Sequence, residues 1–148
     1  MTVLDLPLTL DDRPLPCRVG LVTLATDHTT EVDFAALPSR GIGVYATRIP
    51  FANPVTPETL AAMAGDVTRA AALILPDEPL DAVVYSCTSA SVVIGDDRVR
   101  AAILAGKPGA EPITPISAGF AALRALGADR ITLLTPYTPA TTQPMAEC

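Results

Sequence analysis

Short apolar stretches alternate along this chain with stretches of helical periodicity, and this alternation constrains the fold more than any other feature. Strands are predicted at residues 17–24, 43–49, 81–87, 111–116 and 129–137. Helical segments are predicted between these strands. The first ends at 37, the second covers 56–75, and the third runs to 105 with a break at Gly95. The fourth covers 117–128, and a fifth begins after 137. Strands that alternate with helices favour right-handed βαβ units. The predicted fold class is therefore α/β, with a parallel sheet flanked by helices.

Helix boundary signals support this interpretation. Thr56 is a favourable N-cap, Pro57 suits the first helical position, and Glu58 places an acid in the first turn. Gly127 follows a helical stretch at the position where a left-handed C-cap is common. The segment before the first strand is different. Residues 1–16 alternate leucine with other residues and include Pro7, which predicts an extended arm at a sheet edge or against another chain.

Composition excludes several classes of function. The 148 residues suffice for one domain with a sizeable core, and 49% of them are hydrophobic. A net charge of -6 argues against binding to nucleic acid or to an anionic membrane. No apolar run approaches the roughly 18 residues of a membrane span, and the first 16 residues lack the pattern of a signal peptide. We therefore expect a cytoplasmic protein.

Cysteine and histidine usage is equally sparse. Three cysteines at distant positions fit neither a disulfide framework nor a zinc knuckle. One histidine cannot form a His-rich metal site, so no metal centre is predicted.

Hydroxyl-bearing turns follow the predicted strands. In parallel sheets all strand-to-helix turns lie at one edge, and ligands bind there. The sequence therefore predicts one polar pocket on an apolar scaffold. The turns in question read ATDHTT, SCTSAS, TPIS and TPYTPATT.

Cys87 occupies the most distinctive of these turns, in the stretch VVYSCTSAS. It ends a strand and opens a helix, where free N–H groups and the helix dipole favour a thiolate. A thiolate could add to an activated alkene or move a proton beside a carboxylate. The alternative is a small residue filling a tight turn while its neighbours cap the helix. Local chemistry leaves both interpretations open.

Three motifs resemble the aspartate/glutamate racemase superfamily: ATDHTTE, VVYSCTSAS and LLTPYTPAT, in that order. The sequence is most similar to the branch of maleate cis–trans isomerases, arylmalonate decarboxylases and ectoine-utilisation proteins. This resemblance implies a cofactor-independent enzyme acting on a small carboxylate. It also implies two similar lobes, each of the flavodoxin-like three-layer type, with the active site between them. Each lobe usually offers one catalytic cysteine.

The resemblance assigns roles to particular residues. Cys87 matches the catalytic cysteine of the first lobe, and arylmalonate decarboxylases carry glycine there, which favours isomerase-like or racemase-like chemistry. Thr88, Ser89 and Tyr137 match positions that hydrogen-bond a substrate carboxylate. His28 matches an asparagine of the maleate isomerases and is a candidate substrate contact, although an exposed histidine without such a role is an equal reading.

The second cysteine of the pair would lie beyond residue 148. We therefore expect residues 17–128 to form the first lobe and 129–148 to begin an incomplete second one. Apolar surface around Ile131–Leu134 should then be exposed. Two hypotheses besides an isomerase remain open, the first of which uses the same pocket. The chain could belong to a decarboxylase or racemase of ectoine degradation, or be an incomplete fragment that binds a carboxylate or self-associates as a homo-oligomer.

Overall fold

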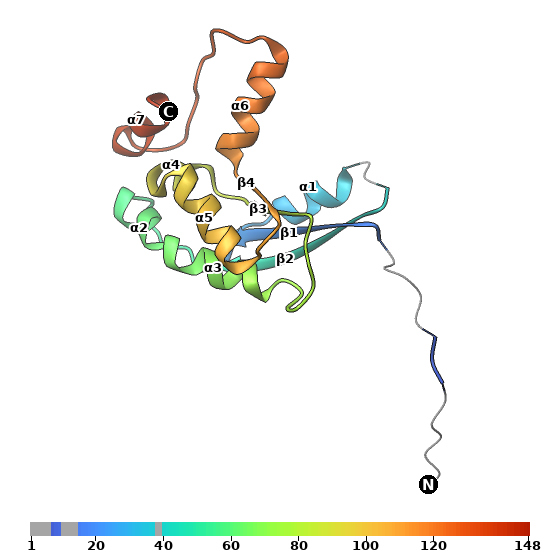
Figure 1. The fold of residues 1–148 in the computed structure, drawn as a ribbon. Helices are drawn as coiled ribbons and strands as arrows, with labels where there is room; N and C mark the ends of the chain where they lie inside the picture. The colour runs from blue at the N-terminus through green and yellow to red at the C-terminus, as the bar shows by residue number, and fades with distance from the viewer. Residues whose placement is uncertain (1–6, 10–14, 38–39) are drawn as a thin grey trace.

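The computed structural model describes residues 7–9, 15–37 and 40–148 (Figure 1). Most of the predicted arm over residues 1–16 lies outside the described residues. In the described part of the chain no helix is long and apolar enough to cross a membrane.

A four-stranded parallel sheet organises the molecule. Its strands follow the spatial order β2-β1-β3-β4. They are β1 (Cys17–Leu24), β2 (Ile42–Ile49), β3 (Ala82–Tyr85) and β4 (Glu111–Ile113). The parallel α/β class predicted from the alternation is confirmed. β1 and β3 are the two inner strands, and residues 20–23 of β1 are buried, as is typical of inner strands covered on both faces.

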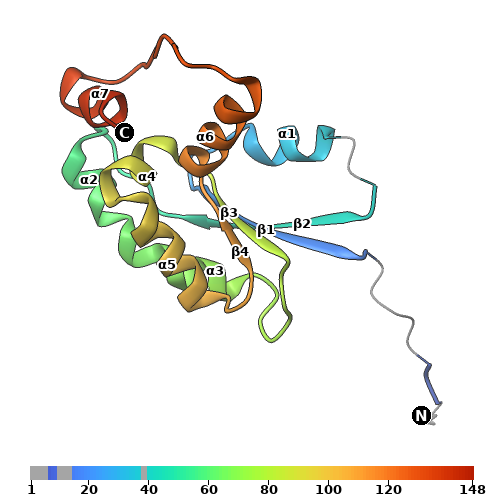
Figure 2. The ribbon, with the colours of Figure 1, turned by 45° about the horizontal axis from the view of Figure 1, so that its top comes forward.

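Seven helices connect and cover these strands in the described residues. They are α1 (Thr30–Ala36), α2 (Pro57–Ala62), α3 (Ala64–Leu73), α4 (Thr88–Ile94), α5 (Asp96–Gly106), α6 (Pro115–Leu126) and α7 (Pro139–Ala146). Figure 2 shows α1 on the opposite side of the sheet from α3 and α5. The main core lies on the α3–α5 side, where Val22, Val83 and Tyr85 of the strands, and Cys87 just after β3, meet apolar residues of α2 to α5.

Local signals place several helix ends as predicted. The Thr56 side chain accepts a hydrogen bond from the Thr59 amide, and Pro57 occupies the first turn of α2. Gly95 interrupts the helical stretch after Cys87, with φ +98° between α4 and α5. Gly127 ends α6 in the left-handed conformation. Glycine tolerates both positive φ values because it lacks a Cβ.

The fifth strand predicted at residues 129–137 is wrong for this structure. The segment between α6 and α7 has no regular structure and runs away from the sheet (Figure 1). Ile131 and Leu134 are 62% and 88% exposed, so the expected exposure of apolar surface is confirmed. A β-strand needs a neighbouring strand for its backbone hydrogen bonds, and β propensity alone does not supply one.

Candidate active site

The sheet has a topological switch point between β1 and β3. The chain passes from β1 to β2 on one side, and β3 pairs with β1 on the other. Ligands of open α/β sheets bind in the crevice at the carboxyl ends of such strands. The turns after β1 and β3 meet there, because the hydroxyls of Thr30 and Ser86 share a hydrogen bond of 3.3 Å. The predicted hydroxyl-bearing turns after β1 and β3 are therefore brought together.

Cys87 lies at this point and is the N-cap residue of α4. The amide of Ser86 still donates to the Val22 carbonyl at 2.8 Å, so the extended backbone of β3 leads directly to the cysteine. The thiol makes no capping hydrogen bond and is only 7% exposed. It lies in the main core on the α3–α5 side of the sheet. Cys87 is thus a buried thiol at the carboxyl end of β3, next in the chain to the groove-lining Ser86.

Two serines of α4 surround the cysteine. Ser89 is 3% exposed, and its Oγ shares a hydrogen bond of 3.8 Å with the Cys87 sulfur. Ser91 is fully buried and donates to the Cys87 carbonyl at 2.7 Å. Ser91 therefore fixes the cysteine backbone, while Ser89 is placed to donate to the sulfur. Thr88, between Cys87 and Ser89, is exposed at the helix start.

The turn after β1 is organised by a carboxylate. Asp27 accepts hydrogen bonds from the amides of Thr29 and Thr30 at 3.0 and 2.9 Å and from the Thr30 hydroxyl at 2.6 Å. Desolvation raises the pKa of Asp27, but these hydrogen bonds and the charge of Arg48 outweigh it, so that the pKa lies below its ordinary value. Asp27 therefore orders the start of α1 as an ionised cap.

Arg48 at the end of β2 holds the same turn, a role that sequence reasoning missed. Its guanidinium donates to the carbonyls of Leu24 and Asp27 at 3.1 and 2.7 Å and pairs with Glu31 at 2.7 Å. The sequence carried a signal for this role: Arg48 ends a predicted strand, and parallel neighbouring strands end at the same edge of the sheet, so Arg48 lies near the turn after β1. His28 is exposed within this turn.

The Asp27 contacts predict an acid-sensitive component of stability. A carboxylate with a lowered pKa stabilises the fold above its unfolded value of about 3.9 and loses that contribution as pH falls toward its folded value. Asp27→Asn should therefore lose less stability than the wild-type chain between about pH 6 and about pH 3. Urea unfolding at both pH values measures the difference. Asp129→Asn, at an exposed position, is the control, and equal acid sensitivity of wild type and Asp27→Asn would contradict the assignment.

The remaining predicted site residue lies elsewhere. Tyr137 lines a separate hollow formed by residues 133–143, and its carbonyl accepts a hydrogen bond from Thr142 at 3.4 Å. Thr114, in the turn after β4, is instead buried and borders a groove of about 420 Å³ together with Ser86. That groove is otherwise mostly apolar, with Val19, Phe34 and Val84 among its walls. The predicted single polar pocket is therefore only partly assembled by the described residues.

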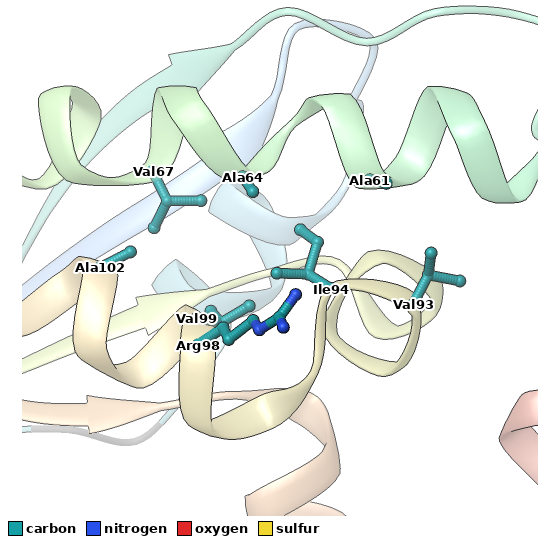
Figure 3. Close-up of a pocket in the computed structure, with 8 residues that line it drawn as sticks. All are labelled: Ala61, Ala64, Val67, Val93, Ile94, Arg98, Val99 and Ala102. Atoms are coloured by element: carbon teal, nitrogen blue, oxygen red, sulfur yellow. The ribbon is translucent and has the colours of Figure 1, made fainter.

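A second hollow, of about 130 Å³, lies between α2–α3 and α4–α5. Figure 3 shows its aliphatic side chains facing one another across the helices, with the Arg98 guanidinium among them. None of the predicted site residues lines it. The hollow has too few polar groups to orient a carboxylate substrate, and we interpret it as a gap in helix packing. Within the described residues no group of three His, Cys, Asp or Glu side chains could hold a metal ion.

Comparison with known proteins finds similarity to a maleate isomerase. It is 34% identical over 141 residues to the maleate isomerase of Nocardia farcinica, covering 88% of this chain and 54% of that protein. No family model matches the sequence. The chain thus spans about half the length of the curated relative.

Solved structures show similarity to maleate isomerases over the same part of the chain. The maleate isomerase Iso of Pseudomonas putida S16 with maleate bound, as a cysteine-to-alanine variant, is 29% identical with a TM-score of 0.74. The maleate cis–trans isomerase of N. farcinica with a covalently bound succinylcysteine intermediate, as a cysteine-to-serine variant, is 27% identical, also with a TM-score of 0.74. Each match covers 88% of this chain and 57% of the solved chain. The fold described above is therefore shared with these enzymes.

Proposed function

We propose that this chain, a homologue of the maleate isomerases over the half of their length that it spans, carries the nucleophile of a cofactor-independent cis–trans isomerase. Its substrate would be a small unsaturated dicarboxylate such as maleate. The observation that carries the proposal is the position of Cys87, a buried thiol at the switch point of a sheet shared with enzymes of this activity. The covalent succinylcysteine intermediate of one relative supports cysteine as the attacking group.

The chemistry requires no redox partner. The Cys87 thiolate adds to one alkene carbon, forming an S–C bond while the π electron pair moves toward the carboxylate on the other carbon. The former double bond is then single and rotates. Return of the electron pair re-forms the alkene in the trans geometry and breaks the S–C bond. Donors placed at the carboxylate would stabilise the enediolate charge between these steps.

In our proposal, different residues near Cys87 contact the sulfur and the two substrate carboxylates. Ser89 serves the sulfur, since its hydroxyl already contacts that atom. Thr88 is exposed on the first turn of α4 and would donate to a substrate carboxylate entering the crevice. His28 is exposed in the turn across the switch point and would contact the distal carboxylate. Tyr137 would join them only after the segment before α7 moves, and α7 itself packs against α4.

One observation favours a second candidate function. Leu126 at the end of α6, and Ile131 and Leu134 in the segment that follows, expose most of their apolar side chains. Large exposed apolar patches mark association surfaces. The chain alone would then be a carboxylate-binding or self-associating unit with little turnover. Light scattering after size-exclusion chromatography distinguishes a monomer from a homo-oligomer.

The test uses a Cys17→Ser/Cys148→Ser background, in which Cys87 is the single thiol. Incubation with maleate should give a mass increase equal to one maleate, located by peptide mapping at Cys87, and proton NMR in heavy water should detect fumarate. Loss of carbon dioxide from an arylmalonate would instead indicate a decarboxylase, and deuterium at the α-carbon of an amino acid a racemase, the two activities considered for ectoine degradation. Absence of both the adduct and fumarate would refute the isomerase proposal.

A further inference from the structure

The Tyr85 phenol is a buried polar group that the mechanism above does not use. Tyr85 is fully buried as the last residue of β3. Its hydroxyl is the buried side-chain oxygen without a hydrogen-bond partner among the described residues. A buried hydroxyl without a partner is destabilising, and native proteins seldom keep one without a reason. The phenol therefore needs an explanation beyond core packing.

Strand geometry places the Tyr85 and Cys87 side chains on the same face of the sheet. Successive side chains of a strand point to opposite faces, so residues two apart share a face. The backbone stays extended through Cys87, with φ -145° and ψ 105°. Both side chains belong to the same core cluster on the α3–α5 side of the sheet. Burial raises the pKa of Tyr85, and the neighbouring Cys87 raises it further through its charge and its side-chain contact. The phenol is thus kept protonated beside the sulfur.

A protonated phenol beside a cysteine is a poor partner for the thiol and a good one for the thiolate. The thiol sulfur is a weak acceptor, whereas hydrogen bonds to ionised groups are about twice as strong as neutral ones.

We propose that Tyr85 is a positioning residue that donates a hydrogen bond to the Cys87 thiolate, holding the nucleophile in its anionic form and aiming it at the crevice. Together with Ser89, it gives the sulfur two hydroxyl donors, one two residues before Cys87 and one two residues after it. The inference rests on the proposed function for its role in catalysis, but the Tyr85–Cys87 interaction is testable without any substrate.

Other charged groups do not offer a competing explanation. The core cluster around the pair is apolar on every packed helix: Leu60 of α2, Val67 of α3, Ala90 of α4 and Val99 of α5, with Met63 between α2 and α3. The titratable and charged residues of the packed helices are exposed or engaged elsewhere. They are Glu58 of α2, Asp66 and Arg69 of α3, and Asp96, Asp97, Arg98 and Arg100 of α5. Helix α7, which packs against α4, carries none.

The test is a Tyr85→Phe substitution in the Cys17→Ser/Cys148→Ser background. Thiolate ultraviolet absorbance, taken as the difference from the same protein with Cys87→Ala, is followed across pH. Loss of the donor should move the ionisation midpoint of the thiol up by about one pH unit, a tenfold fall in thiolate on the acidic side. Tyr45→Phe is the matched control, because Tyr45 also packs against this core but its hydroxyl lies beside Gly43.

Outcomes separate this inference from the proposed function. An unchanged midpoint in Tyr85→Phe would overturn the inference, whether or not Cys87 forms a maleate adduct. A raised midpoint in Tyr85→Phe but not in Tyr45→Phe supports it, even if maleate gives no adduct and the isomerase proposal fails. Urea unfolding is measured in parallel, since a purely structural tyrosine would change the free energy of unfolding and leave the midpoint in place.

Discussion

Cys87→Ser should abolish the maleate adduct and lower any isomerisation by roughly a thousandfold or more. The substitution replaces one atom at a buried position, so the packing around residue 87 is nearly unchanged. Its chemical effect is large, because a serine hydroxyl is scarcely ionised at the pH where a cysteine begins to form thiolate. Serine therefore keeps the shape of the site and removes the nucleophile.

The measurement is adduct formation by intact mass spectrometry, together with the maleate-to-fumarate rate by NMR. Cys17→Ser and Cys148→Ser are matched controls, since they remove thiols at the start of β1 and at an exposed position. Both should retain the adduct. Unfolding by urea should show that Cys87→Ser is folded. Isomerisation by Cys87→Ser at close to the wild-type rate would remove the cysteine from the mechanism.

Gly106→Ala should cause the largest loss of stability, about 1–3 kcal/mol through overpacking. Helices α3 and α5 approach each other closely at Gly106. A Cβ there would overlap the carbonyl oxygen of Thr68 and lie 3.0 Å from both the Ala71 Cβ and the Ala72 nitrogen. These are backbone or short side-chain atoms, so the two helices would have to separate. Thr68 also donates to the Ala102 carbonyl at 3.0 Å, and that contact would be strained.

Gly119→Ala is the matched control for this prediction. Gly119 lies within α6, and a Cβ there meets nothing within 4 Å. The substitution should stabilise the protein by about 0.5–1 kcal/mol, because alanine is the better helix former. Urea unfolding of both variants gives the comparison. Equal effects of the two substitutions would show that the α3–α5 contact does not limit stability.

Several parts of the fold could be predicted because their signals are local. Thr56 and Pro57 mark a helix start through hydrogen bonds within one turn, and Gly95 and Gly127 mark interruptions through backbone conformations that favour glycine. The position of Cys87 at a strand-to-helix turn was predictable for the same reason. The predicted strand at 129–137 shows the limit, because its apolar pattern describes a strand only where a neighbouring strand is present.

The site follows the same division. Proximity of Cys87 and Ser89 follows from their separation by two residues, and Tyr85 shares a strand face with the cysteine by simple alternation. Two other contacts depend on the strand order: the hydrogen bond between Thr30 and Ser86, and the hydrogen bond that Arg48 donates to the Asp27 carbonyl. Tyr137 matched a motif but lies in a different hollow in this structure. A motif identifies a residue type, and only packing determines which residues face it.

By itself, the sequence determined the α/β class, the helix caps and a cysteine at the end of a strand, because periodicity and capping depend on residues within one or two turns. Tertiary structure decided that β1 lies at the centre with β2 and β3 on either side. It also decided that the Cys87 thiol is buried beside an unpaired phenol. Strand order and burial arise from contacts between segments far apart in the chain, and no local pattern encodes them.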